Sequence, residues 1–365
     1  MLKKIRAWIK LTSAPGISSG KAIRAVRELG SPEEYLDRID TPLSDLSFIS
    51  ATALEFLGKP DDPPDWGNIA GLIEKHEIKF VSIIDKGYPF ILKTIPDPPA
   101  WLFYLGELKE SDFVRSLAVV GTRNPSMYGI TQCNKITEEL VQQQIVIVSG
   151  LAFGIDSVAH NAALRSGGRT IAVLGTGIEQ IYPPEHRELS GEIKQKGVLV
   201  SEYLPGSKIN VWNFPSRNRI ISGLSQGTWV VEGGLKSGSL ITAKYAREQQ
   251  RPVFTLPGDI NRKSALGANH LLQEGAFAVL KSSDILNVLG ISLSESPGQS
   301  LKIEELNEFE KKVYQILLSQ GEETDYDKLL ILSKLTVGEL STIVLSLELK
   351  GYAKKAAGNR IYPIK

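Results

Sequence analysis

This sequence of 365 residues is poor in the side chains that build disulfides and metal centres. Cys133 is its single cysteine, which excludes an intrachain disulfide framework and a cysteine-based zinc site. The four histidines lie far apart, without metal-ligand spacing, at His76, His160, His186 and His270. No apolar run approaches the roughly 20 residues that cross a bilayer, and Lys10 interrupts the stretch that would have to continue a signal peptide. We therefore expect a cytoplasmic protein without a metal and without membrane contact.

The standard nucleotide-binding motifs are missing as well. No Gly-x-x-x-x-Gly-Lys-Ser/Thr stretch is present, which excludes a P-loop NTPase. The tripeptide GTG at 175–177 begins like a dinucleotide fingerprint, but Gln180 stands where the third glycine belongs. The sequence therefore predicts no nucleotide cofactor.

Charge is nearly balanced over the whole chain, with a net charge of +1, but it is unevenly distributed. Residues 1–27 carry seven Lys or Arg and no acid, and residues 208–263 carry nine basic against three acidic residues. Residues 301–350 carry six basic against ten acidic residues. Basic regions of this kind are the electrostatic signature of a nucleic-acid partner.

Composition predicts three domains. Residues 58–67 (GKPDDPPDWG) are typical of a linker, and residues 292–300 (SLSESPGQS) form a second polar stretch of flexible composition. We predict a small helical domain over residues 1–66, a large domain over residues 67–291 and a C-terminal domain over residues 304–365.

The central domain alternates short β-branched runs with helical patterns. The predicted strands are 80–84, 101–105, 117–120, 145–148, 170–174, 198–201, 228–231 and 253–256. The predicted helices are 129–143, 155–166, 185–195, 240–249 and 268–273. Continuous apolar strands separated by helices indicate an α/β fold, a Rossmann-like doubly wound and mostly parallel sheet.

Ligands bind beyond the carboxyl ends of the strands in such a sheet. Five predicted strands run into glycine-rich loops, namely GTR (121–123), SGLAFG (149–154), GTG (175–177), EGG and SGS (232–239), and PGD (257–259). Glycine lets a backbone approach a ligand closely, and SGS precedes a predicted helix whose free N–H groups suit an anion. One such loop is more simply a short turn. Five on one edge, with Arg123, Arg217 and Arg219, predict phosphate binding.

Residues suited to acid–base catalysis are sparse. His160 follows Asp156 by four positions on a predicted helix, and we interpret the pair as tying the helix to its loop rather than as a general base. Glu232 ends a predicted strand, and we interpret it as holding Arg217 or Arg219 in position. The sequence therefore predicts no catalytic residue.

Several stretches occur together and in one order between residues 88 and 280. They are YPFILKTIPDPPAWLFYLGEL (88–108), AVVGTRNPSMYG (118–129), VSGLAFGIDSVAH (148–160), TIAVLGTGIEQIYPPEH (170–186), SEYLPGS (201–207), FPSRNRIISGLS (214–225), VVEGGLKSGSLITAKYA (230–246), VFTLPGDI (253–260) and GANHLLQEGA (267–276). In this order they resemble the DNA-processing protein A family (DprA/Smf). The resemblance implies a homodimer that binds single-stranded DNA with little sequence preference. It also implies that the protein protects incoming strands during natural transformation and loads the recombinase RecA onto them.

The resemblance and the strand ends together give the expected site. The residues expected to bind DNA phosphates are Gly121, Thr122, Arg123, Gly150, Lys208, Arg217, Asn218, Arg219, Ser237, Gly238, Ser239 and Thr242. Trp212 and Phe214 are expected to stack bases from an exposed loop, whereas the nearby aromatics Tyr128 and Phe153 are weaker candidates. The family often has alanine after the strand-ending glutamate, where this chain has Gly233.

The flanking domains carry weaker signals. Residues 11–20 (LTSAPGISSG) resemble the hairpin of helix-hairpin-helix and SAM-like modules, and a plain helical domain with a basic face is the alternative. From residue 304, three helical stretches, a strand at 352–356, the turn at 358–359 and a strand at 360–363 resemble a winged helix. Its third helix, 337–349, holds no Arg or Lys, so we predict contact with protein or with its own chain rather than with duplex DNA. A wing contact to DNA through Lys354, Lys355 or Arg360 is left open.

Two other classes of function compete with DNA binding. Rossmann folds with a Pro-Gly-Gly-x-Gly-Thr loop act on nucleoside monophosphates as phosphoribohydrolases, and this chain has EGGLKS (232–237) in an analogous place. The chain departs from that pattern because no Gly-Thr follows the paired glycines. A pure interaction scaffold would leave the convergence of arginines and glycines unexplained.

Overall fold

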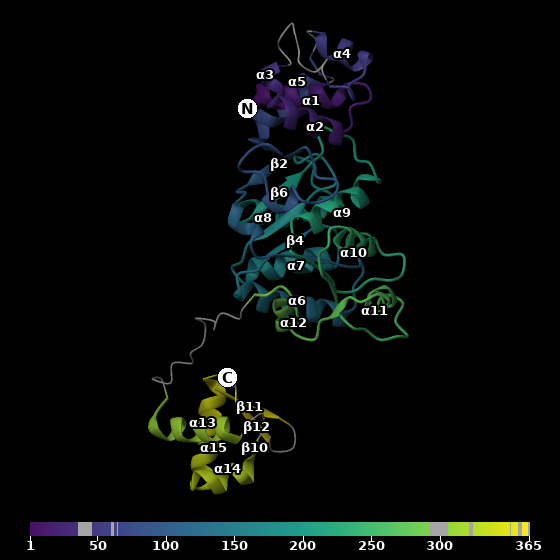
Figure 1. Cartoon of the computed structure of the whole chain (residues 1–365). Helices are drawn as coiled ribbons and strands as arrows, with labels where there is room; N and C mark the ends of the chain where they lie inside the picture. The colour runs from purple at the N-terminus through teal and green to yellow at the C-terminus, as the bar shows by residue number, and fades with distance from the viewer. Residues whose placement is uncertain are drawn as a thin grey trace. The chain divides into compact units, whose positions relative to one another are not determined.

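The computed structural model describes residues 1–35, 46–59, 62–63, 65–291, 306–320, 324–350, 352–356 and 360–363. The chain divides into two compact units, Met1–Leu293 and Ser294–Lys365, each of which is described by itself (Figure 1). Three predictions from the sequence fall on residues outside this description: the polar stretch 292–300, the domain start at residue 304 and the wing turn at 358–359. The predicted linker 58–67 is described only in part.

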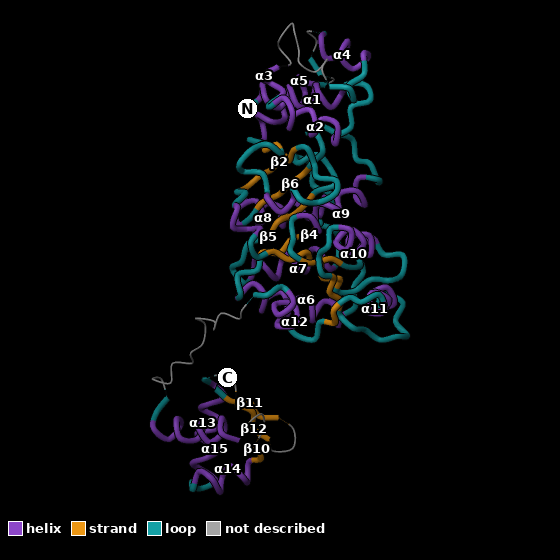
Figure 2. The backbone as a smooth tube through the Cα atoms, viewed as in Figure 1, coloured by secondary structure: helices purple, strands orange, loops and turns teal. Residues whose placement is uncertain are grey.

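The first unit is built on one sheet, drawn in orange in Figure 2. Its strands are β1 (Lys79–Ser82), β2 (Trp101–Gly106), β3 (Ser116–Val120), β4 (Val146–Ser149), β5 (Thr170–Val173), β6 (Val198–Ser201), β7 (Gly227–Val230), β8 (Val253–Thr255) and β9 (Phe277–Ala278). Within the described residues they lie in the order β1-β2-β6-β5-β4-β3-β7-β8-β9. Neighbouring strands are parallel across the series β6-β5-β4-β3-β7-β8-β9. Strands β1 and β2 add an antiparallel edge next to β6. The predicted α/β fold with a mostly parallel sheet is confirmed.

Both faces of the sheet are covered. Its helices are α6 (Met127–Gln142), α7 (Ile155–Arg165), α8 (Arg187–Lys196), α9 (Asn213–Gly223), α10 (Gly238–Glu248), α11 (Leu266–Gln273) and α12 (Ser282–Val288). Along β3, Leu117 and Val119 belong to one buried apolar cluster, whereas Ala118 and Val120 belong to another. Because successive side chains of a strand point to opposite faces, this alternation places a separate core on each side of the sheet.

Two of these helices, α9 and α12, were not predicted from the sequence. The segment around Trp212 and Phe214, predicted as an exposed loop, is the start of α9, which begins at Asn213. Pro215 lies in the first turn of this helix, where the missing N–H has no intrahelical partner to lose. Its presence therefore did not exclude a helix.

The N-terminal helices pack on the sheet within the same unit. They are α1 (Leu2–Ser13), α2 (Ser19–Leu29), α3 (Pro32–Tyr35), α4 (Ala51–Gly58) and α5 (Trp66–His76). Trp8 of α1 meets Trp101 of β2 in a T-shaped contact, with ring centroids 6.0 Å apart. One apolar cluster contains residues of α1, α2 and the strands, so this part of the chain shares a core with the sheet.

The second unit has its own apolar core, which includes Val313, Leu329 and Leu340. Its elements are α13 (Glu308–Gln320), β10 (Thr324–Asp325), α14 (Tyr326–Ser333), α15 (Val337–Leu349), β11 (Ala353–Ala356) and β12 (Arg360–Pro363). The described strands pair antiparallel in the order β10-β12-β11. Three helices and a terminal hairpin are the elements predicted for a winged helix, and β10 is an addition.

No single helix in the described ranges is long and apolar enough to cross a membrane. One bent pair, Tyr326–Ser333 with Val337–Glu348, passes the same test of length and composition.

Candidate nucleic-acid interface

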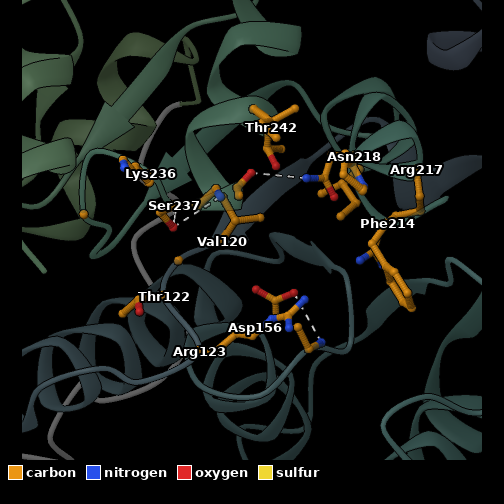
Figure 3. Close-up of a pocket in the computed structure, with 18 of the residues that line it drawn as sticks. Val120, Thr122, Arg123, Asp156, Phe214, Arg217, Asn218, Lys236, Ser237 and Thr242 are labelled. Carbon is orange, nitrogen blue, oxygen red and sulfur yellow. Dashed lines mark hydrogen bonds between the residues drawn. The ribbon is translucent and has the colours of Figure 1, made fainter. Parts of the chain in front are cut away.

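A cavity of about 710 Å³ opens where β3 and β7 run into their loops (Figure 3). Thr122, Arg123 and Asp156 lie on one side of it, and Asn218, Ser237 and Thr242 lie on the other. The full lining is Val120, Gly121, Thr122, Arg123, Ala152, Asp156, Tyr182, Val211, Phe214, Pro215, Arg217, Asn218, Ile221, Gly234, Lys236, Ser237, Gly238, Ser239, Ile241, Thr242, Lys263 and Ser264. The carboxyl ends of parallel strands thus converge on one open space, as the topology requires.

Helix N-termini at this edge differ in what already occupies them. At α6, the N-cap Ser126 donates its N–H and its hydroxyl to the Glu232 carboxylate, at 3.0 and 2.9 Å. At α7, the Asp156 carboxylate accepts from the N–H groups of Gly150 and Ala152, at 3.1 and 3.4 Å. A carboxylate offsets the partial positive charge of a helix N-terminus, so these two helices offer little to an external anion.

The N-terminus of α10 remains open. Its N-cap Ser237 accepts from the N–H of Ser239, and the first turn of the helix has no acidic residue. A methyl group added at Gly238 would meet no atom within 4 Å, which places this backbone at open space. The geometry therefore leaves α10 as the helix N-terminus best suited to an external anion.

Arg217 brings a buried positive charge to the same cavity. The side chain comes from α9, is 4% exposed, and donates to the carbonyl oxygens of Gly150, at 2.7 Å, and Val173. Burial lowers the pKa of Arg217 to about 10 while the Asp156 carboxylate opposes the shift, so the guanidinium is charged at neutral pH. Its Nε atom has no hydrogen-bond partner within the described part of the chain.

Further cations line the opening. Lys236 and Lys263, both exposed, join Arg123 and Arg217, whereas Asp156 is the one acidic residue among the described lining residues. Burial raises the pKa of Asp156, whereas the positive charge of Arg217 lowers it. The two side chains therefore interact as opposite charges within a cavity whose other charged groups are positive. The cavity thus presents a net positive charge to solvent.

Most of the site residues predicted from the sequence meet at this cavity. Those that line it are Gly121, Thr122, Arg123, Phe214, Arg217, Asn218, Ser237, Gly238, Ser239 and Thr242. Gly150 lies behind the lining, where a methyl group would stand 2.6 Å from the Arg217 guanidinium. Its lack of a side chain gives Arg217 its place.

Besides Gly150, three predicted residues do not line the cavity: Lys208, Trp212 and Arg219. Arg219 pairs instead with Asp97, at 2.9 Å, and with Glu202, at 2.6 Å. Trp212 is 76% exposed just before α9. Residues two positions apart on a helix point in different directions. Arg217 therefore faces the cavity, whereas Arg219 forms ion pairs away from it.

The interpretation of Glu232 is wrong. Its carboxylate accepts from Ser126 and from the hydroxyl of Ser264, whereas Arg217 and Arg219 have other hydrogen-bond partners. Gly129 permits this packing, since a methyl group there would lie 2.2 Å from the Glu232 carboxylate. Glu232 therefore fixes the start of α6.

The loop after Glu232 is held by its glycines. The carbonyl oxygen of Gly233 accepts from the N–H groups of Gly267 and Ala268 at the start of α11, at 2.8 and 3.1 Å. A methyl group on Gly267 would lie 2.6 Å from the Gly233 and Gly234 oxygens. These glycines allow a close backbone approach that anchors the loop.

The interpretation of Asp156 and His160 as a tie between their helix and its loop holds for Asp156 and not for His160. His160 is fully buried, and its Nδ1 lies 2.7 Å from the Thr170 hydroxyl on β5. Burial lowers the pKa of His160 to about 3, so the ring is neutral at pH 7. Asp156 ties α7 to its loop, while His160 ties the same helix to the neighbouring strand.

The lining residues outside the predicted site include Lys236, Lys263 and Tyr182. Lys236 and Lys263 lie inside the basic stretch 208–263, which was the available signal. Tyr182 packs its ring against Phe214, with centroids 5.4 Å apart, and only the fold brings the two together.

The basic N-terminal region makes mostly internal contacts. Lys4 pairs with Asp85, Arg6 with Asp62, and Arg24 with Glu28. The Lys10 and Lys21 ammonium groups donate to the carbonyl oxygens of Lys59 and Gly16. These contacts favour the plain helical domain over a phosphate-binding hairpin.

The fold and its basic cavity define a Rossmann-like protein with a site at the carboxyl edge of the sheet. A family model described as DNA recombination-mediator protein A matches residues 79–290. Protein Smf of Synechocystis is 38% identical over 324 residues, which cover 79% of this chain and 81% of that protein. DNA processing protein DprA of Bacillus subtilis is 44% identical over 226 residues, which cover 62% of this chain and 76% of that protein.

Solved structures agree. That of DprA from Streptococcus pneumoniae superimposes with a TM-score of 0.66 at 34% identity, covering 79% of this chain and 97% of that one. A structure of Helicobacter pylori DprA, solved to explain its single-stranded DNA binding mode, gives a TM-score of 0.52 at 30% identity, covering 58% and 95%. The chain belongs to the DNA recombination-mediator protein A (DprA/Smf) family.

Proposed function

We propose that the cavity binds the backbone phosphates of single-stranded DNA with little preference for base sequence. The observation that carries this proposal is the charged, buried Arg217 beside the open N-terminus of α10. Backbone N–H donors and arginine forks suit phosphate oxygens and read no base edge. A strand held this way binds whatever its sequence.

Family membership supports the finer parts of the proposal. The Helicobacter pylori relative binds single-stranded DNA, and two other relatives are called DNA processing proteins. On the basis of its family, the protein protects incoming single strands during natural transformation, forms a homodimer and loads RecA onto the strands. On the same basis, it is a DNA-binding protein and not an enzyme.

The site geometry favours binding over nucleotide hydrolysis. Asp156 is the one carboxylate among the described lining residues, and its Oδ2 already accepts from two backbone N–H groups. Glu232 is 4% exposed and is held by Ser126 and Ser264. A hydrolase needs a carboxylate or imidazole within reach of the bond to be broken. The carboxylates of Asp156 and Glu232 are instead hydrogen-bonded to groups of the protein itself.

The test is fluorescence anisotropy with labelled single- and double-stranded oligonucleotides across a salt series. Arg123→Ala is compared with wild type and with Arg165→Ala, which removes an arginine from the last position of α7, at the opposite edge of the sheet. We expect the log–log salt slope for single strands to be about −0.7 per phosphate contact. Arg123→Ala should weaken binding and reduce the slope by about 0.7, and Arg165→Ala should do neither.

The opposite results are equally clear. If Arg123→Ala and Arg165→Ala bind alike, the cavity is not the DNA site. Release of free base from nucleoside monophosphates by the wild-type chain, lost in Arg123→Ala, would establish the hydrolase instead.

A further inference from the structure

Phe153 is an exposed aromatic ring at the border of the cavity. It is 43% exposed and directly follows Ala152, which lines the cavity. The segment that supplies Tyr182 to the lining also supplies His186, whose ring packs against Phe153 in a T-shaped contact at 4.9 Å. Phe153 therefore lies next to the proposed phosphate site without contributing to it.

The ring and the loop that carries it are both held in place. His186 Nδ1 is hydrogen-bonded to the carbonyl oxygen of Leu151, at 2.8 Å, which orients the imidazole against Phe153. In the loop backbone, Gly154 has a φ of +78°, and a methyl group there would lie 2.3 Å from the Thr122 oxygen. The loop that carries Phe153 is thus packed against the phosphate-facing loop after β3. An exposed ring with its position set loses little conformational freedom when a ligand stacks on it.

The phosphate site by itself does not distinguish the two forms of DNA. A duplex displays phosphates as a single strand does, and backbone contacts dominate the affinity for both. In a duplex, however, both faces of each base are covered by the neighbouring base pairs. A single strand can offer a free base face to an aromatic ring, and such stacking is tolerant of sequence.

We propose that Phe153 stacks on a base of the bound single strand, next to the phosphate in the cavity, and that this contact makes the site prefer single- over double-stranded DNA. The inference rests on the proposed phosphate binding and adds to it the group that recognises the form of the DNA. His186 acts as a positioning residue for this ring.

The experiment measures the affinity of the full chain for three probes of equal length: an ordinary single strand, a single strand of abasic sites and a duplex. The variants are Phe153→Ala and Phe153→Leu. The control is Phe90→Ala, which removes a ring that is 47% exposed and outside the lining. Phe153→Ala should weaken binding of the ordinary strand by roughly tenfold, as expected for one base–aromatic stack. Its affinity for the abasic strand and the duplex, and its salt slope, should equal those of wild type. Phe153→Leu keeps apolar bulk without a π face and should resemble the alanine variant, and Phe90→Ala should resemble wild type.

Each other outcome overturns the inference. If Phe153→Ala weakens the abasic strand as much as the ordinary one, the ring only supports the loop. If Phe153→Leu binds the ordinary strand as wild type does, no stacking occurs. In both cases, salt-dependent binding of the abasic strand by wild type would still support phosphate binding in the cavity, because that strand has phosphates but no bases. If wild type binds no probe at all, the two proposals fall together.

Discussion

Substitution of Gly150 by alanine tests how Arg217 is held. The new methyl group would lie 2.6 Å from both terminal nitrogens of the guanidinium. Arg217 is the neighbour that can move, because the contact is at the end of a side chain that borders the cavity. Moving it breaks its hydrogen bonds to the carbonyl oxygens of Gly150 and Val173.

The expected cost follows from those two bonds. A hydrogen bond to a charged group contributes about 1.5–3 kcal/mol, and a displaced guanidinium regains part of this from water in the cavity. We expect Gly150→Ala to lower the free energy of unfolding by about 2–4 kcal/mol. Because the displaced cation also changes the site, the variant should bind single-stranded DNA more weakly.

Urea unfolding followed by tryptophan fluorescence measures the stability. All five tryptophans lie within Met1–Leu293, so the signal reports the first unit alone. The control is Gly191→Ala, in the middle of α8, where a methyl group meets no atom within 4 Å. This control should be neutral or stabilising by up to about 1 kcal/mol, since alanine is the better helix former.

A double-mutant cycle with Arg217→Ala decides the cause. If Gly150→Ala acts by displacing Arg217, it should cost little once the guanidinium is gone. Full additivity of the two substitutions, or an unchanged urea midpoint for Gly150→Ala alone, would refute the reasoning.

Three further predictions follow from buried or paired groups. Arg219→Ala should leave DNA affinity within about twofold but lower the free energy of unfolding by about 1–3 kcal/mol, because it leaves the Glu202 carboxylate without its partner; weaker DNA binding at unchanged stability would contradict this. His160 has a folded pKa of about 3, below the 6.5 of an ordinary histidine, so the stability it contributes is complete above pH 6.5 and is lost as pH falls toward 3. Unfolding curves should show wild type losing about 2 kcal/mol more than His160→Gln between pH 7 and pH 5, and parallel losses would show that His160 does not titrate in this way. Burial raises the pKa of the Cys133 thiol to about 12, so a thiol reagent should react with the native chain only as fast as it unfolds, and rapid labelling in the absence of urea would show the thiol to be accessible.

The phosphate loops could be predicted from the sequence because their chemistry is local. Glycines and hydroxyl residues immediately after apolar strands lie at the carboxyl edge of any parallel sheet. Arg123 and Ser237–Ser239 were therefore found from position alone, and the structure places them around one cavity. The third helix of the second unit was predicted over its observed bounds, Val337–Leu349.

Side-chain partnerships could not be predicted in this way. Arg217 and Arg219 are two positions apart, yet one faces the cavity and the other pairs with Glu202, because their directions depend on where α9 packs. Glu232 was assigned to an arginine, but its nearest polar neighbours come from residues more than 30 positions away in the chain. Likewise, the N-terminal lysines and arginines form a basic region in sequence, but five of them contact the chain's own carboxylates or carbonyl oxygens.

The sequence by itself determined most of the sheet, the edge at which we propose that DNA binds and the residue types that meet there, because periodicity and strand ends are properties of neighbouring positions. Only the tertiary structure decided which helix N-terminus stays open. Glu232 covers that of α6 and Asp156 that of α7, whereas no acidic side chain occupies the first turn of α10. Asp156 belongs to the first turn of α7 itself, but Glu232 reaches α6 from a distant part of the chain, and this contact could not be read from the neighbours of Ser126. The electrostatic interaction that neutralises the N-terminus of α6 acts through space rather than along the chain.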